Sequence, residues 1–221
     1  MPRAGLSRGA VVAIALDLVD AGGPTGFADL TLAKVAARAG VATPSLYKHV
    51  GSLAALRREV AVVSDDDFTR TIAEATVGLA GPDAVTALAH ATRRFAHERP
   101  GRYAAVQVAP DPDDPADADH RAAAQRGVQV VAAVLRGFDL PDGRAIDAIR
   151  SVRASLHGFV ALELSGGYRL PDDLDQSFDV HVRMLLAGLE ALCPAAGRRR
   201  AGTPPDRTGE PPREFPYGVE R

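Results

Sequence analysis

The sequence is poor in cysteine and lacks both tryptophan and long apolar runs. It contains one cysteine, Cys193, and no tryptophan. A single thiol excludes an intramolecular disulfide framework and a multi-cysteine zinc site, and it favours a reducing, cytoplasmic location. No run approaches the roughly 18–20 apolar residues of a membrane-spanning helix, so we expect no membrane association. Arg3 and Arg8 precede an apolar stretch that Asp17 and Asp20 interrupt, which is typical of an amphipathic helix rather than a signal peptide.

The motifs of common enzyme classes are also absent from the sequence. We find no phosphate-binding glycine loop, no nucleophile elbow and no zinc-type cluster. The acidic segments 65–67 and 111–119 lack the spacing of a calcium loop, and we expect them to be solvent-exposed surface. His90 and His97 stand seven residues apart, whereas chelating histidines on a helix usually stand four apart. We therefore expect no enzymatic activity, no cofactor and no bound metal.

Charge is distributed unevenly along the 221 residues. Apolar residues make up 46 % and charged residues 24 %, with a net charge of −2, as in an ordinary globular protein. Residues 1–60 carry seven basic and four acidic residues, a net charge of +3, so the remainder carries −5. A basic N-terminal segment followed by an acidic remainder indicates that the N-terminal segment binds a polyanion.

Helical periodicity dominates the chain, and strand-type alternation is nowhere sustained. Helices are predicted over about 7–21, 31–40, 43–50, 53–79, 83–99, 102–108, 116–136, 144–165 and 174–192, separated by glycine- and proline-containing breaks. The fold class is therefore all-α. Residues 194–221 are rich in proline, glycine and arginine and have no periodic apolar face, which predicts a disordered tail.

Two short predicted helices with a glycine between them form the most informative segment. Thr31 opens the first, and Gly40 ends it by supplying a left-handed cap. Val41 follows, where it can fill the gap between the helices. Thr43 is expected to cap the second helix, with Pro44 at the first helical position, where its missing N–H costs nothing. This is the layout of a helix-turn-helix, whose second helix enters the major groove of DNA.

The second helix divides into a core face and an outer face. Leu46 and Val50 are spaced i, i+4 and should face the core. The remaining side chains offer hydroxyl, phenol, amine and imidazole groups, which suit phosphates and base edges. Free N–H groups at the two helix starts suit phosphates as well. The candidate DNA-binding residues are Thr31, Thr43, Pro44, Ser45, Tyr47, Lys48 and His49.

The segment 30–50, LTLAKVAARAGVATPSLYKHV, resembles the TetR family of transcriptional regulators: the LT start, the alanine-rich helix, the GV turn and the LY–H spacing are all present. The resemblance implies a helix-turn-helix DNA-binding domain over 6–62 and a helical ligand-binding and dimerisation domain over 63–193. It further implies a homodimer that binds double-stranded operator DNA, most often as a repressor that a small-molecule effector releases.

One position departs from the family pattern. The family usually has a phosphate-contacting lysine at the start of the fourth helix, where this chain has Leu53. Ser52 or the N–H groups of that helix are candidates to replace that contact, with Arg57 or Arg58 as candidates to assist. The substitution also leaves open an alternative, a helical ligand- or protein-binding module whose DNA binding is lost or weakened.

The C-terminal part carries a weaker resemblance in its His157-Gly158 pair, which marks one type of C-terminal domain in this family. That resemblance implies that the last two helices form a four-helix bundle with those of a partner, and Ala154, Gly158 and Ala161 would permit close approach. Phe95, Tyr103 and His157 are the candidate residues of the ligand pocket.

Overall fold

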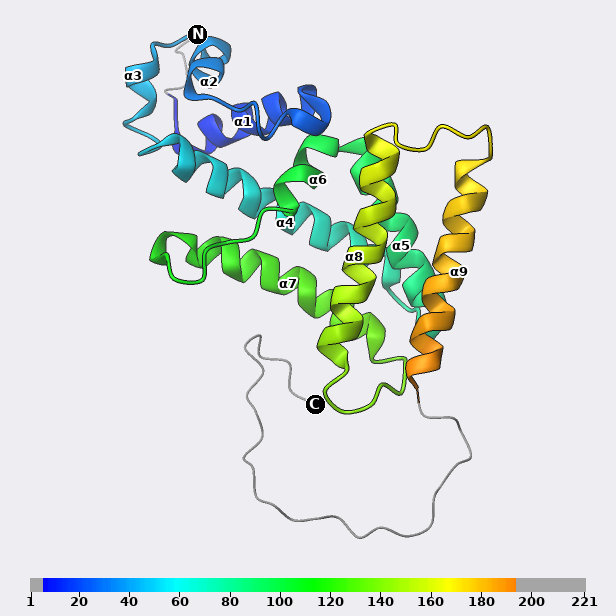
Figure 1. Ribbon diagram of the computed structural model, residues 1–221. Coiled ribbons are helices and arrows are strands. Elements are labelled where there is room, and N and C mark those ends of the chain that lie inside the picture. Colours follow the sequence, from blue (N-terminus) through cyan, green and yellow to red (C-terminus); the bar gives the residue numbers. More distant parts are fainter. Residues whose placement is uncertain (1–5, 194–221) are drawn as a thin grey trace, which may run out of the picture.

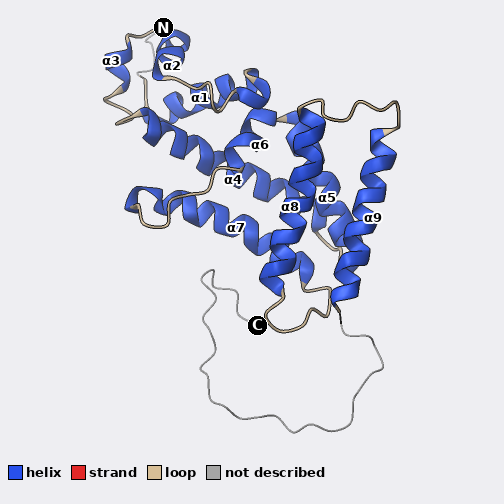
Figure 2. Ribbon diagram, viewed as in Figure 1, coloured by secondary structure: helices blue, strands red, loops and turns tan. Residues whose placement is uncertain are grey.

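A computed structural model describes residues 6–193, and every regular element within that range is a helix (Figures 1 and 2). The predicted all-α class is therefore confirmed; the tail predicted over 194–221 lies outside the described residues. The α-helices are α1 Arg8–Ala21, α2 Leu32–Ala39, α3 Thr43–Leu46, α4 Leu53–Thr76, α5 Gly81–Glu98, α6 Pro100–Val106, α7 Ala118–Leu135, α8 Ala145–Leu164 and α9 Leu174–Leu192. Two short 3₁₀ helices join them, η1 Gly23–Thr25 and η2 Pro115–Asp117.

Hydroxyl side chains begin α1 and α2. The Oγ of Ser7 accepts a hydrogen bond from the amide of Ala10, and the Oγ1 of Thr31 accepts one from Lys34, both at 3.2 Å. These caps satisfy amides that a helix leaves free, and each contributes about 1 kcal/mol of stability. The sequence thus fixes where the first helices start.

The first three helices and the start of α4 enclose a core of their own, which we call the head (residues 6–62). Fully buried side chains at its centre are Val11, Ala15, Val19, Leu30, Val35, Leu46, Leu56 and Val60. Because the short helices α2 and α3 bury one side against this core, their other side is left at the outer edge of the molecule (Figure 1).

The long helix α4 runs from the head into the rest of the molecule, which we call the body (residues 63–193). Its Leu56 and Val60 belong to the core of the head, whereas its Ile72 belongs to the core of the body. It packs against α5, α6 and α7. The 24 residues of α4 span about 36 Å at 1.5 Å per residue. The proposed domain boundary at 62/63 therefore falls within a continuous helix.

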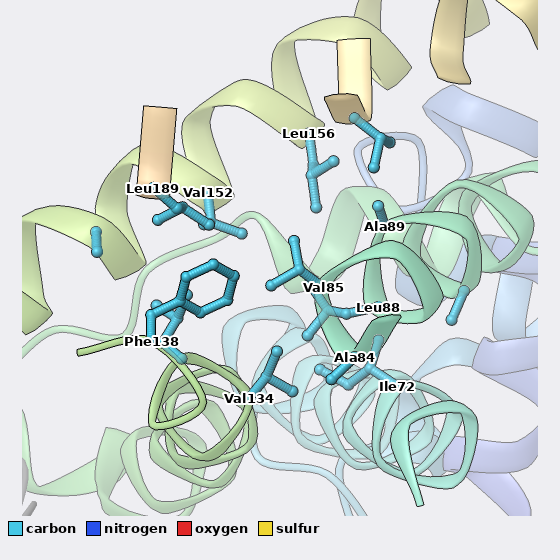
Figure 3. Packing of buried hydrophobic residues seen from close by; sticks show 14 of the residues in the cluster. Ile72, Ala84, Val85, Leu88, Ala89, Val134, Phe138, Val152, Leu156 and Leu189 are labelled. Carbon is cyan, nitrogen blue, oxygen red and sulfur yellow. The ribbon is translucent and has the colours of Figure 1, made fainter. Parts of the chain in front are cut away.

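The body is built around α5. Val85 and Leu88 of α5 face Val152 and Leu156 of α8, and Leu189 of α9 lies beside Val152 (Figure 3). Below them, Val134 and Phe138 close the core at the end of α7. This packing ties α8 and α9 to α5 by one face each and leaves the opposite face of both helices exposed.

Candidate nucleic-acid interface

The turn between α2 and α3 has the geometry that the sequence predicts. Gly40 adopts φ 68°, ψ 33°, and its amide bonds back to the carbonyls of Ala36 and Ala37. The amide of Val41 also bonds to the carbonyl of Ala36, at 3.1 Å. The half-buried side chain of Val41 packs against the core of the head. Only glycine enters this left-handed region without a steric cost, so Gly40 sets the angle between the two helices.

The start of α3 differs from the prediction. Ala42, with φ −74° and ψ 143°, occupies the N-cap, and no side chain caps the helix. Thr43 already has helical backbone and Pro44 follows in the first turn. The prediction of a threonine cap was therefore wrong by one residue. The main-chain carbonyl of Ala42 accepts from Ser45 at 2.9 Å, and proline needs no acceptor, so the turn closes without a side-chain cap.

The helix α3 is also shorter than predicted and covers only Thr43–Leu46. The amides of His49 and Val50 both bond to the carbonyl of Leu46, at 2.8 and 2.9 Å, so the segment after α3 tightens into a turn. Leu46 and Val50 are nevertheless buried, at 0 and 2 % exposure. The burial that we predicted for these two side chains therefore survives the change in backbone conformation.

The residues predicted to contact DNA differ in exposure. Tyr47 is 55 % exposed, and Pro44, Lys48 and Thr31 are also exposed. Thr43, Ser45 and His49 are half-buried. The hydroxyl of Thr31 accepts from the amide of Lys34, which leaves its proton free for a phosphate oxygen. Lys48 and Tyr47 thus present the most accessible donors of α3 and the turn that follows it.

The suggested replacements for the family lysine are largely committed within the protein. Leu53 packs, partly buried, against the core of the head. The Nη2 of Arg57 donates to the carbonyls of Ala28 and Leu30, at 2.7 and 3.1 Å. Arg58 forms ion pairs with Asp114 and Asp117. Both guanidinium groups thus hold loop and helix junctions of the molecule together, and a role for either in phosphate contact stays a prediction.

Ser52 serves a structural role as well. Its Oγ accepts from the amide of Ala55 at 3.0 Å and caps α4. Its hydroxyl proton and the unbonded amides of the first turn of α4 are the remaining donors at this position.

A joint between head and body lies where α6 meets the end of α1. Gly101 approaches the main chain of α1 and η1 so closely that an added Cβ would lie 2.2 Å from the carbonyl oxygen of Val19 and 2.9 Å from that of Gly23. No real Cβ tolerates such a contact with backbone, so only glycine fits here. This joint was not predicted from the sequence, because no local pattern around Gly101 indicates a contact with the distant helix α1.

An arginine clamp adjoins this close approach. Arg102 donates from Nη2 to Asp20 of α1 at 2.7 Å and from Nη1 to Asp67 of α4 at 2.5 Å. Its side chain is only 15 % exposed. Although burial opposes the charge, the bonds to Asp20 and Asp67 leave the pKa of Arg102 above its ordinary value. One residue of α6 thus connects α1 with α4 through charge-assisted hydrogen bonds.

The three candidate pocket residues gather in the body. Phe95 and Tyr103 are buried, and both rings make edge contacts with Phe68, at centroid distances of 5.3 and 6.3 Å. The Oη of Tyr103 lies 3.2 Å from the Nδ1 of His157. Burial raises the pKa of Tyr103 to about 12 and lowers the pKa of His157, so at neutral pH the phenol and the imidazole are uncharged. This cluster is separate from the two surface pockets described below.

The histidines on α5 pair with carboxylates rather than with each other. The Nε2 of His90 lies 3.3 Å from Asp179, and that of His97 lies 3.0 Å from Glu163. Arg93, between them, forms a bidentate bond with Glu163. An open pocket of about 400 Å³ lies beside them, lined by His90, Arg93, Arg94, His97 and Asp175. Within residues 6–193 no three metal-ligating side chains converge. No helix in this range is both long and apolar enough to cross a bilayer.

Known proteins resemble this chain over most of its length. The family described as "Tetracyclin repressor-like, C-terminal domain" matches residues 85–185. An uncharacterized HTH-type transcriptional regulator of Mycobacterium tuberculosis, Rv0681, is 38 % identical over 84 % of this chain and 82 % of its own length. A second such regulator, YobS of Bacillus subtilis, is 30 % identical over 85 % of this chain and 95 % of its own.

Solved structures share the fold. The protein BioQ, solved with its natural double-stranded DNA operator, superposes with a TM-score of 0.55 at 23 % identity, over 85 % of this chain and 99 % of its own. A TetR variant of Acinetobacter baumannii, solved in complex with minocycline, superposes with a TM-score of 0.59 at 22 % identity, over 86 % of this chain and all of its own. With the helix-turn-helix, the helical body and these relatives taken together, the chain belongs to the TetR family of transcriptional regulators.

Proposed function

We propose that this protein is a homodimeric repressor that binds operator DNA through α2, α3 and the turn after α3, and that a small molecule bound in the body releases it. The observation that carries the proposal is the pair of short helices on the outer edge of the head. Their apolar side is buried, while Tyr47, Lys48 and Thr31 remain exposed with free donors. Operator binding implies action in the cytoplasm, where the DNA lies.

The exposed faces of α8 and α9 support a dimer. On α8, Ala154, Gly158 and Leu162 follow one another at i, i+4 and i+8, and Leu162 is 50 % exposed. On α9, Val180 and Met184 are 44 and 70 % exposed. Nothing lies within 4 Å of a Cβ built on Gly158, so a partner helix has room to approach its backbone. These stripes would pack against the same helices of a second copy in a two-fold arrangement.

A conformational change caused by an effector bound in the body can be transmitted to the head by two connections. The helix α4 is continuous from one to the other, and α6 contacts α1 through Gly101 and Arg102. The cluster of Phe95, Tyr103 and His157 lies next to both, since Tyr103 belongs to α6 and Phe68 of α4 touches two of the rings. A ligand that favours one position of α4 and α6 would change the spacing of the two heads, and a coupling of about 1–3 kcal/mol lowers DNA affinity measurably.

The test is DNA binding by the purified dimer, measured by fluorescence anisotropy on duplexes from the region around its own gene at several salt concentrations. Lys48→Ala should weaken binding and reduce the salt slope by about one, because one phosphate contact is lost. Tyr47→Ala should weaken binding without lowering the melting temperature. Arg169→Ala, which removes an exposed cation from the body instead, is the matched control and should bind like the wild type.

The proposal is refuted if the folded dimer shows no salt-sensitive, sequence-selective binding to DNA. That result would favour the alternative of a helical module that has lost its DNA contact, in which case Leu53 is the first position to restore to lysine.

A further inference from the structure

A second pocket lies at the junction of head and body, away from the cluster of Phe95, Tyr103 and His157. It has a volume of about 390 Å³ and is formed by α1, the first half of α4, η2 and the first turn of α7. Its apolar lining comes from Val12 of α1 and from Ala55, Val62 and Val63 of α4. Pockets that hold small molecules usually measure about 300–1,000 Å³, so its size suits a compact ligand.

A buried polar pair lies at the inner side of this pocket. His120 lines the pocket although it is only 3 % exposed, and its Nε2 lies 3.2 Å from the Oδ2 of Asp65. Asp65 is itself buried and is not among the lining residues, so it lies behind the imidazole. The two atoms face each other, and neither has a further hydrogen-bond partner. A buried charged pair without further hydrogen bonds is costly, and DNA contact does not account for it.

Negative charge prevails around the pocket. Glu59 and Asp119 line it, and Asp65 stands behind His120. The two lining arginines are already neutralised: Arg8 pairs with Glu59 at 2.8 Å, and Arg58 is held by two carboxylates, those of Asp114 and Asp117. Asp119 is exposed on the rim. A cation entering here would be attracted by Asp119, which Arg8 compensates only in part, and by Asp65, which faces His120 and Arg153, whereas an anion would be repelled by both.

We propose that this junction pocket binds a small organic cation, a primary amine with a compact apolar body. The apolar part lies against Val12, Val62 and Val63, and the ammonium group lies between Asp119 and His120. The negative charge of Asp65 acts through the imidazole: with a proton on Nε2 toward Asp65, Nδ1 of the neutral ring is an acceptor. Burial raises the pKa of Asp65, and a bound cation would favour its ionised form.

The pocket joins α1 of the head to α7 of the body, so an occupant would fix the position of the head. That consequence for operator affinity rests on the proposed function, but the binding itself does not. Binding is therefore measured without DNA, and a change in operator affinity on adding the ligand is measured separately.

The first experiment is calorimetric titration of the full chain with three probes of one shape: 2-phenylethylamine, neutral 2-phenylethanol and anionic 3-phenylpropanoate. We expect saturable binding of the amine, at least tenfold weaker binding of the alcohol and none of the anion. Asp119→Asn should weaken amine binding about threefold to tenfold through the loss of one nearby charge. Asp113→Asn is its matched control, an exposed aspartate of the neighbouring loop outside the pocket, and should bind like the wild type.

A second pair of variants tests the location without disturbing the buried histidine. Ala116 and Ala118 are both exposed, but only Ala116 lines the pocket. Ala116→Phe should abolish amine binding by filling the space, and Ala118→Phe should leave it unchanged. The proposal is overturned if the amine gives no saturable heat, if the anion binds as well as the amine, or if the two phenylalanine variants bind alike. Amine binding without any effect on operator affinity would keep the site and count against the proposed regulation.

Discussion

The close approach of Gly101 to α1 gives the sharpest test of how the body holds the head. Gly101→Ala adds one methyl group at a point where the Cβ would lie 2.2 Å from the carbonyl oxygen of Val19 and 2.9 Å from that of Gly23. Both contacts are with main chain, so no side-chain rotation relieves them. The helix α6 must move away from α1, and the bond from Arg102 to Asp20 must lengthen with it.

The magnitude follows from two opposing effects. Overpacking of this kind costs about 1–3 kcal/mol, and it exceeds the gain of up to about 1 kcal/mol that alanine brings over glycine in a helix. For a domain of this size a loss of 1 kcal/mol lowers the melting temperature by about 2–4 °C. We therefore expect Gly101→Ala to melt a few degrees below the wild type and to bind its operator with altered affinity.

The assay is thermal unfolding followed by circular dichroism, beside Gly9→Ala as the matched control. Gly9 also lies in a helix, but nothing stands within 4 Å of its added Cβ. Its variant should melt at or above the wild-type temperature. If Gly101→Ala proves as stable as Gly9→Ala, the backbone contact between α6 and α1 does not exist as described, and the route through α6 is refuted.

Three further predictions concern the core, the dimer and an ion pair. Leu46→Ala should cost about 2–5 kcal/mol in urea unfolding, because Leu46 is fully buried; an unchanged midpoint would refute its role in the core. Met184→Asp should yield a monomer in sedimentation velocity, because it places a charge on the exposed stripe of α9, and a dimer at micromolar concentration would contradict that interface. The hydrogen bonds from Arg93 hold the pKa of Glu163 below its ordinary value, so the stabilisation is present above the ordinary pKa of glutamate and is lost as the pH falls through the depressed one. Glu163→Gln should therefore lower the melting temperature at pH 7, and the difference should shrink towards about pH 3; a difference independent of pH would contradict the ion pair.

Local signals account for the parts of the fold and of the candidate interface that could be predicted. Thr31 and Gly40 act within four residues of themselves, by a hydroxyl cap and a left-handed turn, and both have the predicted geometry. The burial of Leu46 and Val50 also follows from their spacing. The details that failed, such as the cap at Thr43 and the length of α3, depend on which carbonyl each amide selects. Several acceptors are within reach there, and sequence spacing does not discriminate between them.

Capping, turn formation and amphipathic spacing act between neighbours in the chain, so the all-α class, the start of the first helices and the helix-turn-helix were predictable from it. How the head meets the body depends on tertiary packing. Arg102 and Asp20 are 82 residues apart, and Asp65 and His120 meet only because α7 packs along α4. In the sequence, none of these residues can be told apart from an ordinary charged or polar surface residue. Their partners, and hence the joint and the junction pocket, exist only once separate helices have packed their apolar faces together.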